Sequence, residues 1–386
     1  MVRRPYAALA AVALATVLTG CSLVAPGSAP RRSGPGTPPT TNPASSSGFL
    51  TRSGSQLMLD GRTYQPVSVN AYELATDWGI NAGCGAMLDD AALHSFFAGL
   101  PSGATVRIWG FQGAMATNVV TGARDWGPLD RVVAAAAAAG DHLIVSLGNE
   151  WGVCDDGVYK DLSWYLSGYR DVAAGNGYDI PTESYWGWVQ DVVSRYAAST
   201  TIAMWELINE PEAPQCAPGY ASPCPGHLVC NESASAAALR SFYDVVGAEV
   251  KRLDPNHLVE SGSGGGQQCG WAGGDFATVS ASPGIDVASF HDYEGGVLPS
   301  DFNNRLPQAT ALGKPLLVGE VGLEGGDVAG CASLGARAAQ AAAKIDAMLG
   351  AGAAGMFFWD WVPDPQTSAC TLDVGSSDPI MTLLRT

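Results

Sequence analysis

Trp205-Glu206-Leu207-Ile208-Asn209-Glu210-Pro211 is the most informative stretch for the fold, and it ends an apolar run that begins at Thr201. The run is typical of a buried strand, and its last residues lead directly into a carboxylate. Pro211 disfavours any strand or helix immediately behind that acid. A carboxylate at the C-terminal end of a strand is where parallel α/β barrels carry their chemistry. The stretch therefore directs the search to a second carboxylate on a matching strand end.

Eight apolar, β-rich runs recur along the chain, separated by helical or loop segments. Continuous apolar runs are typical of strands buried on both faces of a parallel sheet. Strand and helix alternating about eight times in ~330 residues predict a (β/α)8 TIM barrel. The alternative is an open doubly wound sheet, but that fold calls for a Gly-rich phosphate loop where Asn70-Ala71-Tyr72-Glu73 stands. The predicted strands are Pro66–Asn70, Thr105–Trp109, His142–Leu147, Thr201–Leu207, His257–Ser261, Ile285–His291, Pro315–Glu320 and Gly355–Trp359.

Other segments predict a hairpin and the helices. Residues 55–64 read as an N-terminal hairpin with Asp60-Gly61 at its turn. Residues 183–198 carry one apolar stripe, and Thr182 is the expected N-cap. A helix over residues 336–349 is expected to end at Gly350.

Composition excludes one class of partner and favours another. The formal net charge is −17, so we expect no nucleic-acid partner, because phosphate binding needs basic patches. Eleven Trp residues suit a surface that stacks on flat apolar faces, such as those of sugars.

The N-terminus indicates export. Residues 1–20 have a basic start and a short apolar run, which is typical of a signal peptide and too short to span a membrane. The run ends in Leu18-Thr19-Gly20-Cys21, which resembles a bacterial lipobox and predicts lipidation of Cys21. Residues 21–48 are a Pro/Ser/Gly-rich tether without apolar anchors. Residues 49–386 are then a catalytic domain on the outer face of a cell membrane; the alternative is plain secretion.

Eight cysteines remain beside Cys21, and an even number in an exported chain predicts up to four disulfides. No zinc-like close pair occurs, so we expect no metal site. Cys331 and Cys370 follow the seventh and eighth strands, which are neighbours in a barrel, and we predict that they pair. The pairing of the others stays open: Cys84, Cys154, Cys216, Cys224, Cys230 and Cys269.

The second carboxylate is Glu320, at the end of the seventh predicted strand. Glu210 closes the fourth, and on a barrel both side chains reach the same bowl. Two carboxylates facing across a cleft are what glycosidic cleavage needs, because one protonates the leaving oxygen while the other attacks or activates water.

These residues resemble glycoside hydrolase family 5, over about residues 55–365. The resemblance implies that Glu320 is the nucleophile and Glu210 the acid/base. It also implies that Asn209 binds the sugar 2-hydroxyl. The remaining matches are Arg107 beside the nucleophile, Tyr293 on the nucleophile, His291 near the −1 sugar or the acid, and Trp359 as the platform under that sugar.

Within that family the chain is most similar to endo-β-1,4-mannanases, through Asn70-Ala71-Tyr72-Glu73-Leu74 and Leu147-Gly148-Asn149-Glu150-Trp151. Asn149 and Glu150 are thus candidate substrate contacts, with Trp109 and Trp151 as further cleft aromatics. Glu150 departs from the mannanase pattern, which has a neutral residue there, and an added carboxylate would change which sugars fit.

The resemblance implies a retaining mechanism on β-1,4-mannan, with the two carboxyl groups about 5–5.5 Å apart. We expect Arg107 to lower the pKa of Glu320, and burial with the Glu320 charge to raise that of Glu210. No cofactor or metal is needed, and we expect a monomer. The alternatives are a β-glucanase, an exo-β-mannosidase or a non-catalytic glycan-binding surface lipoprotein. Glu206 and Glu210 would share one face of a regular strand, so we expect a bend after Leu207 and leave the role of Glu206 open.

Overall fold

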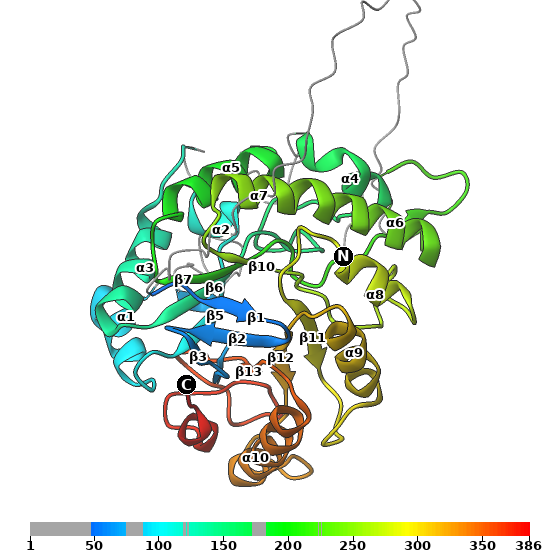
Figure 1. Cartoon of the computed structure of the whole chain (residues 1–386). Helices are drawn as coiled ribbons and strands as arrows, with labels where there is room; N and C mark the ends of the chain where they lie inside the picture. Colours follow the sequence, from blue (N-terminus) through cyan, green and yellow to red (C-terminus); the bar gives the residue numbers. More distant parts are fainter. Residues whose placement is uncertain are drawn as a thin grey trace, which may run out of the picture. The chain divides into compact units, whose positions relative to one another are not determined.

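Eight parallel strands close into a barrel in the part of the chain that the computed structural model describes (Figure 1). The described residues are 48–74, 88–118, 121, 123–171, 183–222, 224 and 226–386. In order around the barrel, the strands are β4 (Val67–Val69), β5 (Thr105–Trp109), β6 (His142–Ser146), β7 (Ile202–Glu206), β10 (Leu258–Glu260), β11 (Ala288–Asp292), β12 (Leu316–Gly322) and β13 (Gly355–Trp359). All eight predicted strands are present.

Backbone hydrogen bonds at two places join the sheets into a closed barrel. The strands form two four-stranded parallel sheets, ordered β10-β7-β6-β5 and β11-β12-β13-β4. The Ala71 N–H donates to the Arg107 carbonyl at 2.9 Å, which joins β4 to β5. The Asp286 N–H donates to the Val259 carbonyl at 2.7 Å, which joins the β10 edge to the segment before β11. The predicted TIM barrel is therefore confirmed, and the doubly wound alternative is wrong.

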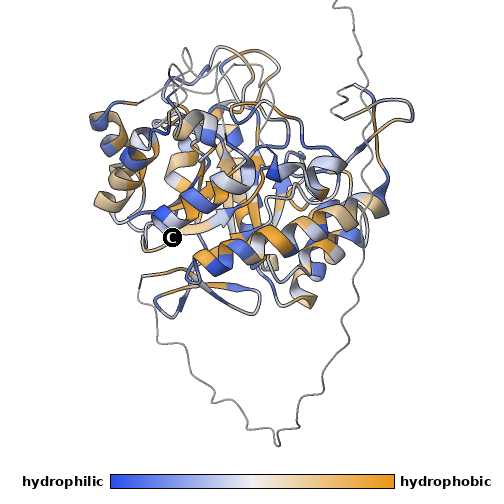
Figure 2. Cartoon of the chain, turned by 90° about the horizontal axis from the view of Figure 1, so that it is seen from above, coloured by the Kyte–Doolittle hydropathy of each residue, from blue (hydrophilic) through white to orange (hydrophobic). Residues whose placement is uncertain are grey.

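Helices surround the strands and bury one side each, so in Figure 2 they show both orange and blue along their length. On α5, the apolar stripe predicted from the sequence is buried, and its residues are Tyr185, Trp188, Val189, Val192, Val193 and Tyr196. Apolar side chains of the strands and helices pack together in one large cluster between the two layers. The α-helices of the described residues are α1 (Asp90–Ala98), α2 (Gln112–Met115), α3 (Gly127–Ala139), α4 (Leu162–Leu166), α5 (Tyr185–Tyr196), α6 (Glu232–Phe242), α7 (Ala248–Leu253), α8 (Asp275–Ser280), α9 (Ser300–Ala311) and α10 (Leu334–Ala351). A short π-helical segment at Tyr243–Gly247 joins α6 to α7.

Two predicted helix ends are wrong. The N-cap of α5 is Ser184, whose side chain accepts a hydrogen bond from the Gly187 N–H, whereas Thr182 lies outside the described residues. Helix α10 continues through Gly350 and ends at Gly352, which takes the left-handed conformation with φ 117°. Glycine weakens a helix interior only modestly, so the end is set by the residue that turns left-handed.

The N-terminal hairpin closes the end of the barrel opposite the predicted site. It comprises β1 (Thr51–Ser53), β2 (Gln56–Leu59) and β3 (Arg62–Thr63). Asp60 and Gly61 both have positive φ, 48° and 75°, as a type I′ turn requires. Apolar residues of this hairpin join inward-facing strand residues in one buried cluster that includes Leu57, Met204 and Phe357.

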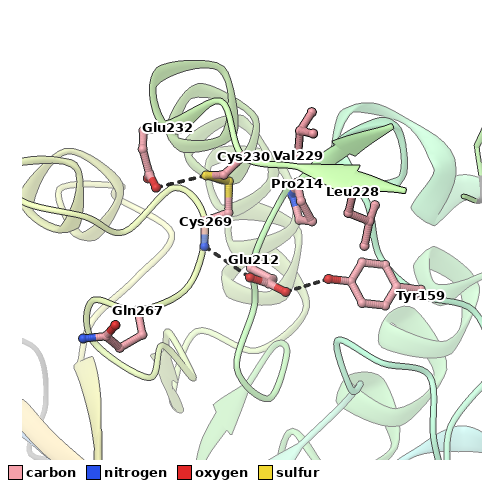
Figure 3. Close-up of a pocket in the computed structure, with 9 residues that line it drawn as sticks. All are labelled: Tyr159, Glu212, Pro214, Leu228, Val229, Cys230, Glu232, Gln267 and Cys269. Carbon is pink, nitrogen blue, oxygen red and sulfur yellow. Dashed lines mark hydrogen bonds between the residues drawn. A yellow bond between two sulfur atoms is a disulfide. The ribbon is translucent and has the colours of Figure 1, made fainter. Parts of the chain in front are cut away.

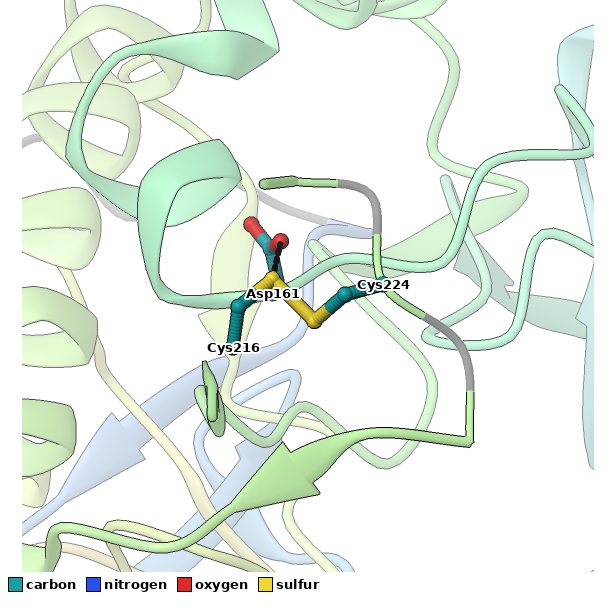
Figure 4. Close-up of side chains that lie close together, drawn as sticks. All are labelled: Asp161, Cys216 and Cys224. Atoms are coloured by element: carbon teal, nitrogen blue, oxygen red, sulfur yellow. Dashed lines mark hydrogen bonds between the residues drawn. A yellow bond between two sulfur atoms is a disulfide. The ribbon is translucent and has the colours of Figure 1, made fainter. Parts of the chain in front are cut away.

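Disulfides hold the loops that leave the C-terminal strand ends. The predicted Cys331–Cys370 bond is present, and two further bonds are Cys216–Cys224 and Cys230–Cys269. Cys154 is also disulfide-bonded, and Cys84 lies outside the described residues. The loop after β7 contains a two-stranded ribbon, β8 (Gln215–Cys216) and β9 (Leu228–Val229). In Figure 4 Asp161 lies beside the Cys216–Cys224 bond, with its Oδ2 3.8 Å from Cys216 Sγ.

The described residues, from 48 onward, make one compact unit. The predicted signal peptide, the lipidation site at Cys21 and the tether up to residue 47 lie outside the described residues. Within the described residues, no helix combines the length and apolar character needed to cross a membrane.

Candidate active site

Glu210 reaches the barrel mouth because the chain leaves the regular path of β7. The strand ends at Glu206 and the backbone bends at the next two residues, one position earlier than the expected bend after Leu207. Glu210 itself has φ +50°, an unusual conformation for a residue with a side chain. Its N–H donates to the Gly262 carbonyl at 2.9 Å, which ties the bend to the loop after β10. Because of this bend, the side chains of Glu206 and Glu210 point in different directions.

Glu320 faces the same mouth because of a bulge in β12. Along the β11–β12 pair, Phe290 lies opposite Val318, but the next residue, His291, lies opposite Glu320. The extra residue is Gly319, where a Cβ would approach His291 Nε2 and Ser289 Oγ to 3.0 Å. An inserted residue changes the face to which the following side chains point. Leu317 and Val318 alternate between the inner and outer apolar clusters, and the bulge then places Glu320 inward.

His291 connects the two carboxyl groups. Its Nδ1 lies 2.7 Å from Glu210 Oε1 and 3.5 Å from Glu320 Oε2. The next residue, Asp292, points to the other side of β11 and meets the buried Lys344 of α10 at 2.6 Å. This buried ion pair fixes the strand end, so alternation along β11 directs His291 into the mouth. One ligand atom each of Glu210, His291 and Glu320 lies within 4.8 Å of the others.

Arg107 is a hub beneath the pair and is completely buried. Its Nη1 donates to Glu320 Oε1 and to Asn70 Oδ1, both at 2.8 Å. Its Nη2 donates to Asn209 Oδ1 at 2.6 Å. The remaining bonds form a bidentate pair with Glu206, at 2.6 and 2.7 Å. All five guanidinium N–H groups are thus occupied, and Arg107 fixes Glu320 and the residue before Glu210 at once.

Glu206, whose role stayed open from the sequence, is the main counter-charge of Arg107. It is fully buried, and its Oε1 also accepts from the Ser146 hydroxyl at 2.6 Å. Burial would raise the pKa of Glu206, but the charge and hydrogen bonds of Arg107 lower it to about 2. Glu206 therefore stays ionised and keeps the guanidinium in place.

Three asparagines complete the floor of the site. The Asn209 Nδ2 donates to Asn149 Oδ1 at 3.3 Å, so its carbonyl faces Arg107 and its amide faces Asn149. The amide of Asn149 donates to the Val153 carbonyl at 2.9 Å. The amide of Asn70 donates to the Gly319 carbonyl at 3.0 Å, which supports the bulge before Glu320.

The pKa values of Glu210 and Glu320 shift in directions that differ from those expected. Burial alone would raise the pKa of Glu210, but the hydrogen bond from His291 outweighs it and lowers that pKa. Burial raises the pKa of Glu320, and the opposing charges of His291 and Arg107 do not reverse this. Arg107 lowers the pKa of Glu320 and burial raises that of Glu210, as expected, but the net directions are opposite to those predicted. The bond from His291 to Glu210 and the burial of Glu320 outweigh the expected effects. The neighbouring carboxylates raise the pKa of His291 against its burial. One proton is thus shared along the short bond from His291 to Glu210.

Tyr293 contacts the carboxyl of Glu320. Its O–H donates to Glu320 Oε2 at 2.5 Å, while Arg107 donates to Oε1. Burial and the charge of Glu320 raise the pKa of Tyr293, so its proton stays on the phenol. Both oxygens of Glu320 are therefore hydrogen-bond acceptors, and this favours the ionised carboxylate.

Aromatic rings line the mouth at the ends of β4, β5 and β13. Trp359 is half-buried, and its ring stacks on Tyr72 with centroids 5.5 Å apart. The Trp109 ring centroid lies 4.5 Å from that of Tyr72 and 5.6 Å from that of Trp359, and Phe111 stacks on Trp109 at 5.0 Å. The peptide bond between Trp359 and Asp360 is cis. These rings give the site a flat apolar surface of the kind that sugar faces stack on.

Glu150 does not lie on the surface of the cleft. It is fully buried, its Oε2 accepts from the Tyr165 hydroxyl at 2.5 Å and from the Glu212 N–H at 3.1 Å, and its own N–H donates to the Asn209 carbonyl at 3.2 Å. Burial raises the pKa of Glu150 well above its ordinary value. We expected a charged Glu150 to contact the sugar directly, but its carboxyl group is buried and cannot do so. Trp151, next in sequence, is 46% exposed.

Two cavities adjoin these residues. One of about 270 Å³ lies behind Glu212, two residues beyond Glu210, and is bordered by the Cys230–Cys269 disulfide (Figure 3). Glu212 accepts hydrogen bonds there from the Tyr159 hydroxyl at 2.6 Å and the Cys269 N–H at 3.2 Å. The other, of about 550 Å³, extends from Tyr293 to the Cys331–Cys370 disulfide.

A metal ion fits this site poorly. Glu210, His291 and Glu320 have the spacing of a ligand set. However, Arg107 places a positive charge on Glu320, and Tyr293 directs an O–H donor at its other oxygen. Both features disfavour a cation and favour acid–base chemistry. Two other such groups contain cysteines that are in disulfides, so they offer no thiolate.

The sequence singled out the residues at the mouth but assigned no role to the layer beneath them: Asn70 and Tyr72 were noted only within a motif, the role of Glu206 stayed open, and Ser146 and Glu260 were not singled out. Asn70, Tyr72, Ser146, Glu206 and Glu260 all border this network. The sequence did mark these positions, because each residue lies at or just after the end of a predicted strand. Which strand-end residues turn inward depends on the bulges, and these are not visible in sequence.

The chain matches known proteins over most of its length. The family described as Cellulase (glycosyl hydrolase family 5) matches residues 104–365. The chain is 31% identical over 287 residues to the probable mannan endo-1,4-beta-mannosidase C of Aspergillus terreus, covering 64% of each protein. It is 28% identical over 324 residues to mannan endo-1,4-beta-mannosidase F of Aspergillus fumigatus, covering 73% of this chain and 66% of that protein. The first of these matches thus spans slightly under two thirds of the relative, and the second about two thirds.

Solved structures share the fold. The endo-1,4-beta-mannanase from Rhizomucor miehei superposes with a TM-score of 0.60 at 21% identity, covering 86% of this chain and 96% of that one. A glycoside hydrolase family 5 mannosidase from the same organism gives 0.59 at 14% identity, covering 88% and 96%. The family match covers more than half of the chain and includes both strands that end in the carboxylates. The chain therefore belongs to glycosyl hydrolase family 5.

Proposed function

We propose that this protein is a retaining glycoside hydrolase that cleaves β-1,4-mannosidic linkages by double displacement. The observation that carries the proposal is the Glu210–Glu320 pair, bridged by His291 and held by Arg107 and Tyr293. In this mechanism Glu320 is the nucleophile and Glu210 is the acid/base.

The first step uses the proton shared by His291 and Glu210. Substrate binding excludes water, and the proton moves along the 2.7 Å bond to Glu210, which donates it to the leaving oxygen. The carboxylate of Glu320 attacks the anomeric carbon and forms a glycosyl ester. Arg107 and Tyr293 orient that carboxylate, so little reorganisation is needed.

The second step reverses the roles. Esterification removes the charge of Glu320, which lowers the proton affinity of Glu210 further. Glu210 then takes a proton from water, and the hydroxide oxygen displaces Glu320. The proton can pass on to His291, whose neighbouring carboxylates favour its protonated form. Two inversions give net retention.

The spacing of the carboxyls supports retention. Oxygens of Glu210 and Glu320 lie within 4.8 Å of each other. Retaining enzymes place the two groups about 5–5.5 Å apart, whereas inverting enzymes leave about 6.5–9.5 Å for a water. Proton NMR of fresh hydrolysis products would test this, because initial release of the α-anomer from a β-mannoside would contradict the proposal.

Mannan is the proposed substrate because the two Aspergillus relatives are named mannan endo-1,4-beta-mannosidases. The family description names cellulase, and one structural neighbour is a mannosidase, so β-glucanase and exo-β-mannosidase activities are the alternatives. Reducing-end release from mannan, cellulose and laminarin would separate the polysaccharides. Products from a manno-oligosaccharide series would separate internal cleavage from release of single mannose units.

A glycan-binding lipoprotein without activity is the alternative from another class. The complete pair and its supporting contacts favour catalysis. Absence of turnover on every one of these substrates, with retained binding, would favour the alternative. The proposed mechanism uses no cofactor or metal, and we propose that the protein acts as a monomer without a nucleic-acid partner.

We propose that the protein is exported and anchored to the outer face of a bacterial membrane through a lipid on Cys21, with plain secretion as the alternative. The support is the sequence Leu18-Thr19-Gly20-Cys21 followed by the Pro/Ser/Gly-rich segment. The anchor would hold the barrel near polysaccharide outside the cell.

A further inference from the structure

Two carboxyl groups lie side by side under the active site. Glu206 of β7 and Glu260 of β10 are register partners on adjacent parallel strands. Such partners point to the same face of a sheet, and Glu206 points into the barrel, where it meets Arg107. Both side chains are completely buried.

Arg107 cannot neutralise both groups. Its five N–H donors are occupied by Glu206, Asn70, Glu320 and Asn209. Among the described residues, no donor meets either carboxyl oxygen of Glu260 in regular hydrogen-bond geometry. Tyr243, which faces the pair from the π-helical segment between α6 and α7, donates instead to the Ser261 carbonyl.

A proton resolves this arrangement. Two ionised carboxylates are acceptors only, so they cannot hydrogen-bond to each other. Burying two such charges beside one arginine is costly, and one of them is expected to protonate. Burial and the charge of Glu206 raise the pKa of Glu260 well above its ordinary value, whereas Arg107 keeps Glu206 ionised. The proton therefore resides on Glu260. The Ser289 hydroxyl of β11, which has no other partner in the described residues, is available to its second oxygen.

We propose that Glu260 is a positioning residue that remains a neutral carboxylic acid and donates its O–H to Glu206. This bond holds Glu206 against Arg107 without adding a second negative charge. Arg107 then keeps its remaining donors on Glu320 and Asn209. The catalytic consequence rests on the proposed glycosidase function, but the protonation state does not.

Infrared spectroscopy tests the protonation state directly. The carbonyl stretch of a protonated carboxylic acid lies apart from that of a carboxylate. Near pH 9, carboxyls of ordinary pKa are ionised, as are Asp155 and Asp141, whose pKa values are about 7 and about 6. Among the described residues, Glu150→Gln removes the other glutamate whose pKa is raised well above normal. We expect a carboxylic-acid band to persist in that variant and to disappear when Glu260→Gln is added. Absence of the band from the single Glu150→Gln variant would overturn the proposal without relying on the folding of any Glu260 variant.

A second comparison tests the positioning role. Glu260→Leu removes the donor, and we expect kcat to fall about tenfold because a hydrogen bond to a charged group is lost. Glu260→Gln supplies a neutral amide donor of the same length, so it should restore most of that loss. Equal losses in the two variants would overturn the positioning role. If the protein cleaved no mannan at all, the infrared result would still report the protonation state of Glu260. Failure of the proposed function can therefore be told apart from failure of this inference.

Discussion

The Nδ1 atom of His291 lies 2.7 Å from Oε1 of Glu210, and this contact decides where the proton of the active site resides. It lowers the pKa of Glu210, and the neighbouring carboxylates raise that of His291. We therefore expect the free site to hold its proton on the pair, and in the proposed mechanism Glu210 becomes the acid when substrate replaces water.

Replacing His291 with asparagine should narrow the pH profile of kcat/KM. In the native protein the pair loses its proton at the raised pKa of His291, above about 6.5. In His291→Asn, Glu210 alone holds the proton, so the alkaline limb moves to lower pH. The His291 charge also lowers the pKa of Glu320, so its loss raises that pKa and moves the acidic limb to higher pH. Unmoved limbs would contradict the shared proton.

Replacing Glu320 with alanine should lower kcat by several orders of magnitude, because no group remains to form the glycosyl ester. Azide, which fits the space left by the carboxylate, should restore turnover and yield a glycosyl azide of inverted configuration. Glu324→Gln changes an exposed carboxylate four residues further on and serves as the control. Near-native turnover in Glu320→Ala would remove Glu320 from the nucleophile role.

Tyr293→Phe should lower kcat/KM by roughly ten- to a hundredfold, because a preorganised donor at the reacting carboxylate is lost. The tyrosine hydroxyl lowers the pKa of Glu320, so the acidic limb should move to higher pH. Tyr159→Phe is the matched control, since that hydroxyl donates to Glu212 instead. The same shift in both variants would show that the effect does not arise at Glu320.

The Cys331–Cys370 and Cys230–Cys269 disulfides form a natural comparison, since each spans 39 residues. Replacing either pair by serine should cost about 4 kcal/mol of unfolding free energy on loop-closure grounds, measured by denaturant titration. Replacing the Cys230–Cys269 pair should in addition raise KM, because the Cys269 N–H holds Glu212 behind Glu210. An equal rise of KM for the Cys331–Cys370 pair would contradict this assignment.

Labelled palmitate should be incorporated into the native protein and not into Cys21→Ala. In the proposed anchor the thiol of Cys21 carries the lipid, so incorporation that survives the replacement would refute it. Release of the unlabelled protein into the medium would support plain secretion.

The order of residues along the chain was enough to predict the barrel and the two carboxylates. Apolar runs of strand length and their alternation with helices require a parallel sheet covered on both faces. A residue at a strand's C-terminal end then reaches the mouth, so the positions of Glu210 and Glu320 on the fourth and seventh strands were enough to pair them. The Cys331–Cys370 bond followed from the same strand order.

Which residues face each other, and where the proton lies, depended on the folded chain. The bulge at Gly319 turns Glu320 inward, and the left-handed backbone at Glu210 separates it from Glu206. The charges on Glu206 and Glu260 depend on burial and on their distance from Arg107. Burial, register and bulges arise from contacts between residues far apart in the chain, so local pattern could not reveal them.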